Sequence, residues 1–75
     1  MDYLVILEKA ENSNWSAYSP DVMGCFATGE TIEETLEEYE SVLRMHLKGL
    51  EEDELPLPKP SAQVRYISIS ITEND

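Results

Sequence analysis

Short apolar runs in the first third of the chain predict three strands. Tyr3–Lys9 reads Y-L-V-I-L-E-K, and its five successive apolar residues are typical of a strand buried on both faces. A polar turn over residues 10–14 separates it from Trp15–Ser19, where large and small side chains alternate as in the second strand of a hairpin. Pro20 ends that strand because proline has no N–H to donate, and Gly24–Thr28 follows as a short third strand.

The next segment predicts one amphipathic helix that begins with a capping box at Thr31. The Thr31 hydroxyl can accept from the Glu34 amide, and the Glu34 side chain can return to the Thr31 amide. Apolar residues then recur every three or four positions and form one stripe: Ile32, Leu36, Tyr39, Leu43, Leu47 and Leu50. The glutamates between them lie away from this stripe, and we expect the helix to end near Glu52.

The last twenty residues predict a linker and one more strand. Leu55–Pro60 reads L-P-L-P-K-P, an extended connector or, as the less favoured alternative, a proline-rich ligand. Val64–Thr72 alternates cleanly and places three isoleucines on one face of a strand, and Thr72–Asp75 should fray. A crossover through the helix puts this strand parallel to the first, at its flank. The chain is thus predicted to be an α+β two-layer module of order β-β-β-α-β, with a mostly antiparallel sheet and one helix on one face.

Composition fits a single small domain, 1–75, that meets a basic partner. Its 75 residues are 41% hydrophobic, with 5 basic and 16 acidic residues and a net charge of −11. That balance disfavours nucleic acid and anionic membranes, and it favours fast, salt-sensitive capture of a basic protein. The alternative is that the acidity only keeps a small protein in solution. No apolar stretch has the length of a signal peptide core or a membrane span, so we expect a cytoplasmic location.

The sequence offers no catalytic or metal-binding constellation, and we expect no enzyme and no cofactor. Cys25 is the only cysteine, so no internal disulfide can form, and one cysteine with one histidine, His46, falls short of a structural zinc set. A two-metal nuclease needs several converging carboxylates, whereas Asp2 and Glu8 only flank the first strand.

The residues that we expect to bind a partner are glutamates of the helix and aromatic residues of the hairpin. Glu33, Glu37, Glu38 and Glu40 would supply charge, and Trp15 or Tyr18 would supply an apolar anchor. Trp15, Tyr18 and Phe26 could form an exposed aromatic patch, or at least two of them could pack under the helix. Alternation puts Trp15 and Tyr18 on opposite faces of the sheet. An apolar outer face would need a cover, most simply a second copy of the chain.

A longer ordered pattern carries a resemblance to a known family. Its pieces are Y-L-V-I-L-E-K, then W-S-A-Y-S-P-D-V-M-G-C-F-A-T-G-E-T-I-E-E-T-L, then H-L-K-G-L-E-E-D-E-L-P-L-P-K-P. Together they cover residues 2 to about 60 and resemble the HicB-type antitoxin family, in a short form without the C-terminal DNA-binding segment of longer members.

The resemblance implies a partial RNase-H-like fold and the role of an antitoxin in a type II toxin–antitoxin pair. Such a protein would bind and occlude a basic HicA-type toxin that cuts RNA. From the charge and the uncovered apolar faces we also expect a homo-oligomer, a dimer or higher, without direct contact to nucleic acid. The alternative is an orphan HicB-like dimeric module with a structural or regulatory role and no toxin partner. Glu54 stands where the family often has glycine, so we expect the helix to end without a left-handed cap.

Overall fold

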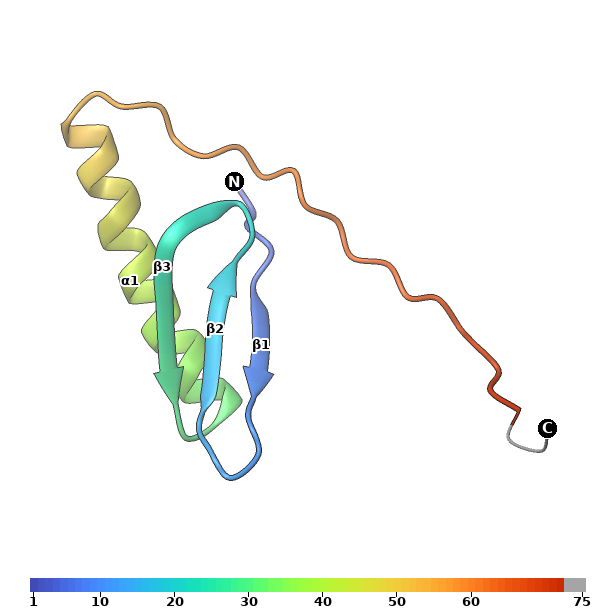
Figure 1. The fold of residues 1–75 in the computed structure, drawn as a ribbon. Coiled ribbons are helices and arrows are strands. Elements are labelled where there is room, and N and C mark those ends of the chain that lie inside the picture. The colour runs from blue at the N-terminus through green and yellow to red at the C-terminus, as the bar shows by residue number, and fades with distance from the viewer. Residues whose placement is uncertain (73–75) are drawn as a thin grey trace.

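A three-stranded antiparallel sheet and one helix make up the body of the protein. The computed structural model describes residues 1–72, so the fraying expected for the last residues lies largely outside the described part. The strands are β1 (Ile6–Lys9), β2 (Trp15–Ser19) and β3 (Val22–Gly29), in the spatial order β1-β2-β3. The helix α1 (Ile32–Glu52) covers one face of this sheet, mainly over β3 (Figure 1). The predicted α+β class is confirmed.

A bulge in β3 decides which of its side chains face the helix. Tyr18 pairs with Phe26, but the next residue of β2, Ser19, pairs with Val22, so β3 has extra residues at this point. Gly24 lies within the bulge with a φ of +84°, a conformation that favours glycine. The bulge shifts the alternation, so that Val22 and Cys25 are both buried. As a result β3 begins before the predicted third strand and runs one residue beyond it.

The core lies between the sheet and the helix and is made mostly of small residues on the strands. Its buried hydrophobic members are Ala17, Val22, Cys25, Ala27 and Tyr39. The helix approaches closely at the end of β3. A Cβ on Gly29 would lie 2.7 Å from the Thr35 Oγ1 and 3.0 Å from the Thr35 amide nitrogen. Position 29 therefore needs glycine because the first turn of α1 leaves no space for a side chain.

Because the helix approaches β3 closely at Gly29, the residues of α1 that are buried differ in part from the predicted apolar stripe. Thr35 and Tyr39 are the buried residues of α1, whereas Ile32 and Leu36 are 38% and 40% exposed. The predicted apolar stripe therefore coincides only in part with the buried face of α1, and Ile32 and Leu36 lie beside that face. They lie on the flank of α1 that continues through Leu43 and Leu47, at spacings of four and seven residues. Leu47 lines a hollow together with Tyr3, which precedes β1, so this flank is on the β1 side of the helix.

Both ends of α1 fall where the sequence predicts them, but their caps differ in detail. The Glu34 amide donates to the Thr31 Oγ1 at 3.1 Å, and the Glu34 carboxylate accepts from the Thr31 hydroxyl at 3.4 Å rather than from its amide. At the other end the Leu55 amide donates to the Leu50 carbonyl at 2.9 Å, and Glu54 has a φ of +57°. This is a left-handed cap made without glycine, so the expected absence of such a cap is wrong.

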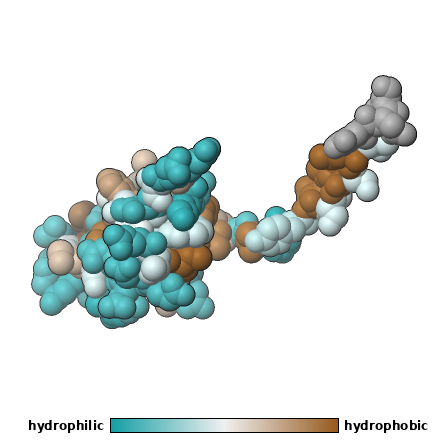
Figure 2. Space-filling view, turned by 90° about the horizontal axis from the view of Figure 1, so that it is seen from below, coloured by the Kyte–Doolittle hydropathy of each residue, from teal (hydrophilic) through white to brown (hydrophobic). Residues whose placement is uncertain are grey.

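The predicted final strand pairs with no strand of the described residues. Residues 53–72 contain no helix or strand beyond the turn that ends α1, and Ile67, Ile69 and Ile71 are 85%, 76% and 83% exposed. We call residues 63–72 the arm, which runs away from the body (Figures 1 and 2). The strand prediction is wrong for the single chain because alternation measures only the capacity of a segment to pair, whereas pairing also needs a neighbouring edge within reach.

Two contacts anchor the base of the arm to the body. The Tyr3 hydroxyl donates to the Pro58 carbonyl at 2.6 Å. The Asp21 carboxylate, in the turn before β3, accepts from the Ser61 amide, the Ser61 hydroxyl and the Ala62 amide at 3.0–3.2 Å. Partial desolvation raises the pKa of the Asp21 carboxyl. The hydrogen bonds from Ser61 and Ala62 outweigh this effect and hold the pKa below its ordinary value. The exit point of the arm is thus fixed by contacts, while its isoleucines are uncovered.

Candidate partner-binding site

A groove of about 550 Å³ lies between β3 and the N-terminal half of α1. Its lining residues are Phe26, Ala27, Thr28, Gly29, Glu34, Glu37, Glu38, Ser41 and Val42. Glu34 lies one helical turn before the adjacent Glu37 and Glu38, and none of the described residues that line the groove is basic. The strand that forms the other wall, β3, is an edge strand of the sheet, so its outer backbone groups face this groove.

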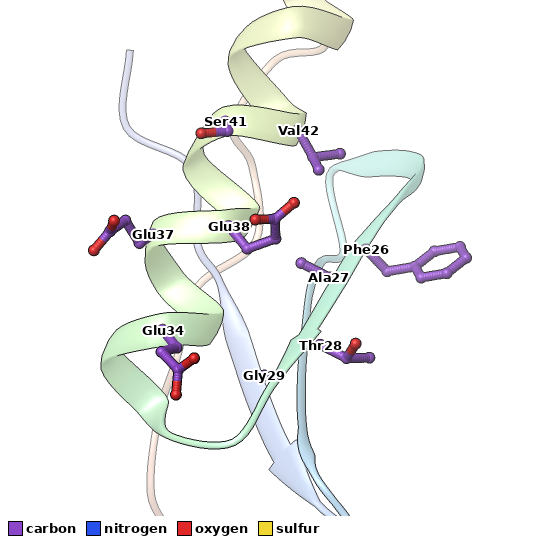
Figure 3. Close-up of a pocket in the computed structure, with 9 residues that line it drawn as sticks. All are labelled: Phe26, Ala27, Thr28, Gly29, Glu34, Glu37, Glu38, Ser41 and Val42. Carbon is purple, nitrogen blue, oxygen red and sulfur yellow. The ribbon is translucent and has the colours of Figure 1, made fainter.

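The glutamates of the groove point in different directions (Figure 3). Glu38 points from α1 across the groove toward β3, whereas Glu37 points away from the strand. Ala27 and Val42 form the apolar floor where strand and helix meet. Because Glu34, Glu37 and Glu38 lie within two turns of one helix, their negative charges add to one local field. The groove can therefore attract basic side chains while its open strand edge offers backbone hydrogen bonds.

An apolar row crosses the outer face of the sheet beside this groove. Ile6 pairs with Tyr18, and Tyr18 pairs with Phe26, so the three side chains lie on one line across the strands. Phe26 is 70% exposed and Tyr18 is 37% exposed, and Phe26 also lines the groove. The prediction that at least two of the three aromatic residues pack under the helix is wrong, since two face outward. The alternative, an exposed aromatic patch, describes Tyr18 and Phe26.

The residues predicted to bind a partner do not form one surface. Glu37 and Glu38 line the groove, and Glu33 is exposed on the same helix. Glu40 lies on the β1 side, where its carboxylate accepts from Arg44 Nη2 at 2.6 Å. The face prediction for the two aromatic residues of β2 is consistent with the observed pairing. Tyr18 faces outward, while Trp15 is half-buried, with the Lys9 Nζ 5.9 Å from its ring centre.

Sequence reasoning missed Glu34 as a member of the site and named Phe26 only in the open alternative of an exposed aromatic patch. The sequence assigns Glu34 to the capping box and to the glutamates away from the apolar stripe but not to the binding residues, although it lies one helical turn before Glu37 and Glu38. The sequence assigns Phe26 to a strand but not to one face of the sheet, because the bulge at Gly24 interrupts the alternation of side chains along β3. The spacing of the acids was a usable signal, whereas the bulge was hard to foresee.

Comparison with known proteins decides the family. The model of the HicB-like antitoxin of bacterial toxin–antitoxin systems matches residues 3–70. This chain belongs to the HicB-like antitoxin family. The match covers the groove, the apolar row and most of the arm, so the arm is part of what this family model describes. An antitoxin role in a toxin–antitoxin system follows at the level of the family.

Curated relatives of this HicB-like chain come from a phage and a cyanobacterium. An uncharacterized 14.9 kDa protein of Haemophilus phage HP1 is 34% identical over 68 residues, which are 91% of this chain and 50% of the phage protein. The UPF0150 proteins ssl0259 and ssr1765 of Synechocystis are 32% and 29% identical over 92% and 93% of this chain, and the alignments span 94% and 89% of those proteins. This chain thus spans half the length of the phage relative. No solved structure gives a significant match.

Two titratable side chains, Cys25 and Tyr39, lie in the core of this HicB-like chain. Burial raises the pKa of the Cys25 thiol, and burial together with the nearby Cys25 raises the pKa of the Tyr39 phenol, so both groups stay protonated at neutral pH. Within residues 1–72, no three histidine, cysteine or acidic side chains are grouped so that they could hold a metal ion. No helix of the described chain is long and apolar enough to span a bilayer.

Proposed function

We propose that this chain is a non-enzymatic, cytoplasmic antitoxin that binds and occludes a basic HicA-type toxin, with the groove between β3 and α1 as its main binding surface. The observation that carries the proposal is the cluster of Glu34, Glu37 and Glu38 beside the open edge of β3. An enzyme that cuts RNA needs basic side chains to hold phosphates. The same side chains are attracted by three carboxylates, so the acidic groove would compete with RNA for them.

The apolar row of Ile6, Tyr18 and Phe26 would add affinity to this electrostatic attraction. Exposed aromatic residues next to a charged groove are typical of interaction hot spots, because they bury a large area with few rotatable bonds. Phe26 belongs to both surfaces, which makes it the residue where charge and apolar contact meet. Of the residues predicted from sequence, Glu37, Glu38 and Tyr18 fit this surface best. Glu33 would contribute to the field at longer range, and Glu40 and Trp15 would contribute little.

We further propose that the functional unit is a homodimer in which the completed sheet has a partial RNase-H-like arrangement. All residues 1–75 would act as one domain, with residues 55–60 as the linker to its last segment. Direct contact with DNA is not part of this proposal, since the net charge of −11 opposes it.

The test is a binding and RNA-cleavage assay with the basic protein encoded beside this gene. The variant E37K/E38K reverses two groove charges, and E51K/E52K makes the same charge change at the far end of α1. We expect the groove variant to weaken binding at least about tenfold at low salt and to restore RNA cleavage. The control should change the dissociation constant less than about threefold.

Other outcomes of this assay separate the alternatives. Equal weakening by both variants would show that only net charge matters and would contradict the groove. No complex with the neighbouring protein in any salt would favour the orphan module without a toxin partner.

A further inference from the structure

The body and the C-terminal segment of this chain have opposite character. Residues 1–54 hold fourteen of the sixteen acidic residues, whereas residues 55–75 hold two basic and two acidic residues and carry no net charge. The arm is also the most apolar exposed segment, with three isoleucines on one face and Tyr66 93% exposed on the other. Figure 2 shows this contrast between a largely hydrophilic body and a projecting arm that carries hydrophobic residues. A segment with this pattern has the sequence of a β-strand but pairs with no strand of the described residues.

The β1 edge of the body lacks a strand. Among the described residues β1 pairs only with β2, so its outer backbone groups are open to another strand. The helix flank above this edge is apolar and partly uncovered, with Ile32 and Leu36 more than one-third exposed. A strand added beside β1 would extend the sheet under this flank, so that side chains on its inner face could cover Ile32 and Leu36.

The other edge suits the arm less well. Beside β3 the helix presents Glu34 and Glu38, and a strand added there would place isoleucines against carboxylates. The apolar face of the arm therefore matches the β1 edge, and the acidic groove stays free for a basic partner.

The path of the arm favours a second copy over its own body. Ser61 and Ala62 are held by Asp21, and beyond them the arm extends straight outward, giving the molecule a length of 59 Å against 28 Å and 16 Å in the other directions (Figure 1). To lie along its own β1 the arm would have to bend back toward the body just after the anchor, whereas it runs away from the sheet (Figure 1). Residues 62–72 contain no glycine, proline, asparagine or aspartate for a turn, and they are rich in β-branched residues that stay extended.

We propose that the arm of one copy adds a fourth strand to the β1 edge of a second copy, and that the exchange is reciprocal across a two-fold axis. Each β1 edge then gains a partner, and each isoleucine face covers the Ile32–Leu36 flank of the other body. Two bodies of like charge repel each other, whereas residues 55–75 carry no net charge and add little to this repulsion, which favours contact through the arm over direct contact between bodies. The exchange does not depend on the proposed toxin, because it needs only copies of this chain.

The test compares two arm variants of the full chain with equal charge change on opposite faces. I69E places a carboxylate on the isoleucine face, and S70E places one on the other face. We expect sedimentation and light scattering to give a dimer for the unmodified chain, at least a tenfold rise in the dimer dissociation constant for I69E, and less than about a threefold rise for S70E. Helix content by circular dichroism should be the same in all three, since the arm lies outside the core.

A mixed-label experiment then identifies which body holds the arm. In a 1:1 mixture of ¹³C-labelled and unlabelled chains, filtered NOEs between the arm isoleucines and Ile32 or Leu36 should appear between different chains. A monomer whose arm NOEs are all within one chain would overturn the proposal in favour of closure on its own β1. A monomer without arm NOEs, a dimer that I69E leaves intact, or an arm ordered only by the toxin would overturn it as well.

Discussion

The two edges of the sheet differ in what the helix presents above them. Beside β3, α1 contributes Glu34, Glu37 and Glu38, and the strand edge opens into an acidic groove. Beside β1, the same helix contributes Ile32 and Leu36, which are partly exposed and apolar. One helix placed off-centre over the sheet thus gives the two edges surfaces of opposite chemistry. Under the two proposals above, this difference would let a chain of this size hold a charged partner at one edge and a strand of its own kind at the other.

The largest expected effect comes from moving the helix off β3. G29A puts a methyl group 2.7 Å from Thr35 Oγ1 and 3.0 Å from the Thr35 amide nitrogen, so the helix or the strand must shift. We expect the free energy of unfolding to fall by about 1–3 kcal/mol in urea denaturation. The matched control is G49A, where the added Cβ meets open space within α1 and should stabilise the protein by about 1 kcal/mol. A neutral G29A would contradict the close contact that positions the helix.

The next prediction compares two single lysine variants, one on each flank of α1. L36K places a charge on the apolar flank and should weaken the dimer about tenfold while leaving toxin affinity nearly unchanged. E38K places a lysine in the groove and should weaken toxin binding about tenfold with little effect on the dimer. Both affinities can be measured by titration calorimetry at two salt concentrations. If each variant weakened both interactions equally, the two edges would not be independent surfaces.

A smaller effect concerns the turn that sends the chain from α1 toward the β1 side. Glu54 holds a left-handed conformation at φ +57°, which costs a non-glycine residue about 1 kcal/mol. E54G should therefore raise the free energy of unfolding by about 0.5–1 kcal/mol in the same urea assay. E52G, within the last helical turn, should lower it by a similar amount. Destabilisation by E54G would mean that the glutamate side chain itself stabilises this cap.

The smallest effect is the release of the arm base by acid. Because hydrogen bonds hold the folded pKa of Asp21 below its ordinary value, they stabilise the base above about pH 4 and are lost as the pH falls through the lowered pKa. The amide shifts of Ser61 and Ala62 should report this transition in an NMR titration from about pH 6 to pH 2. In D21N the same amides should show no such step, and a step that persists in D21N would assign it to another group.

Sequence reasoning predicted much of the fold but less of the site. The bounds of β2 and α1 follow from local signals, namely Pro20 after the strand and the capping Thr31 before the helix. The exposure of Leu36 could not be predicted, since it depends on how closely Gly29 lets the helix approach β3. The outward position of Phe26 depends on the bulge at Gly24, and the unpaired arm depends on which edge is within reach. The exposure of Leu36, the position of Phe26 and the unpaired arm all depend on tertiary contacts, which local periodicity cannot predict.

The central claim is that a basic toxin binds the β3 edge and leaves the β1 edge to the arm. Amide hydrogen exchange, followed by NMR with and without the basic protein encoded beside this gene, tests it most directly. The account predicts slower exchange in the complex for the groove amides of residues 26–29 and 34–41. The amides of residues 4–8 in and before β1 should be unchanged. Protection of residues 4–8 by the toxin, with no change along the groove, would contradict the account.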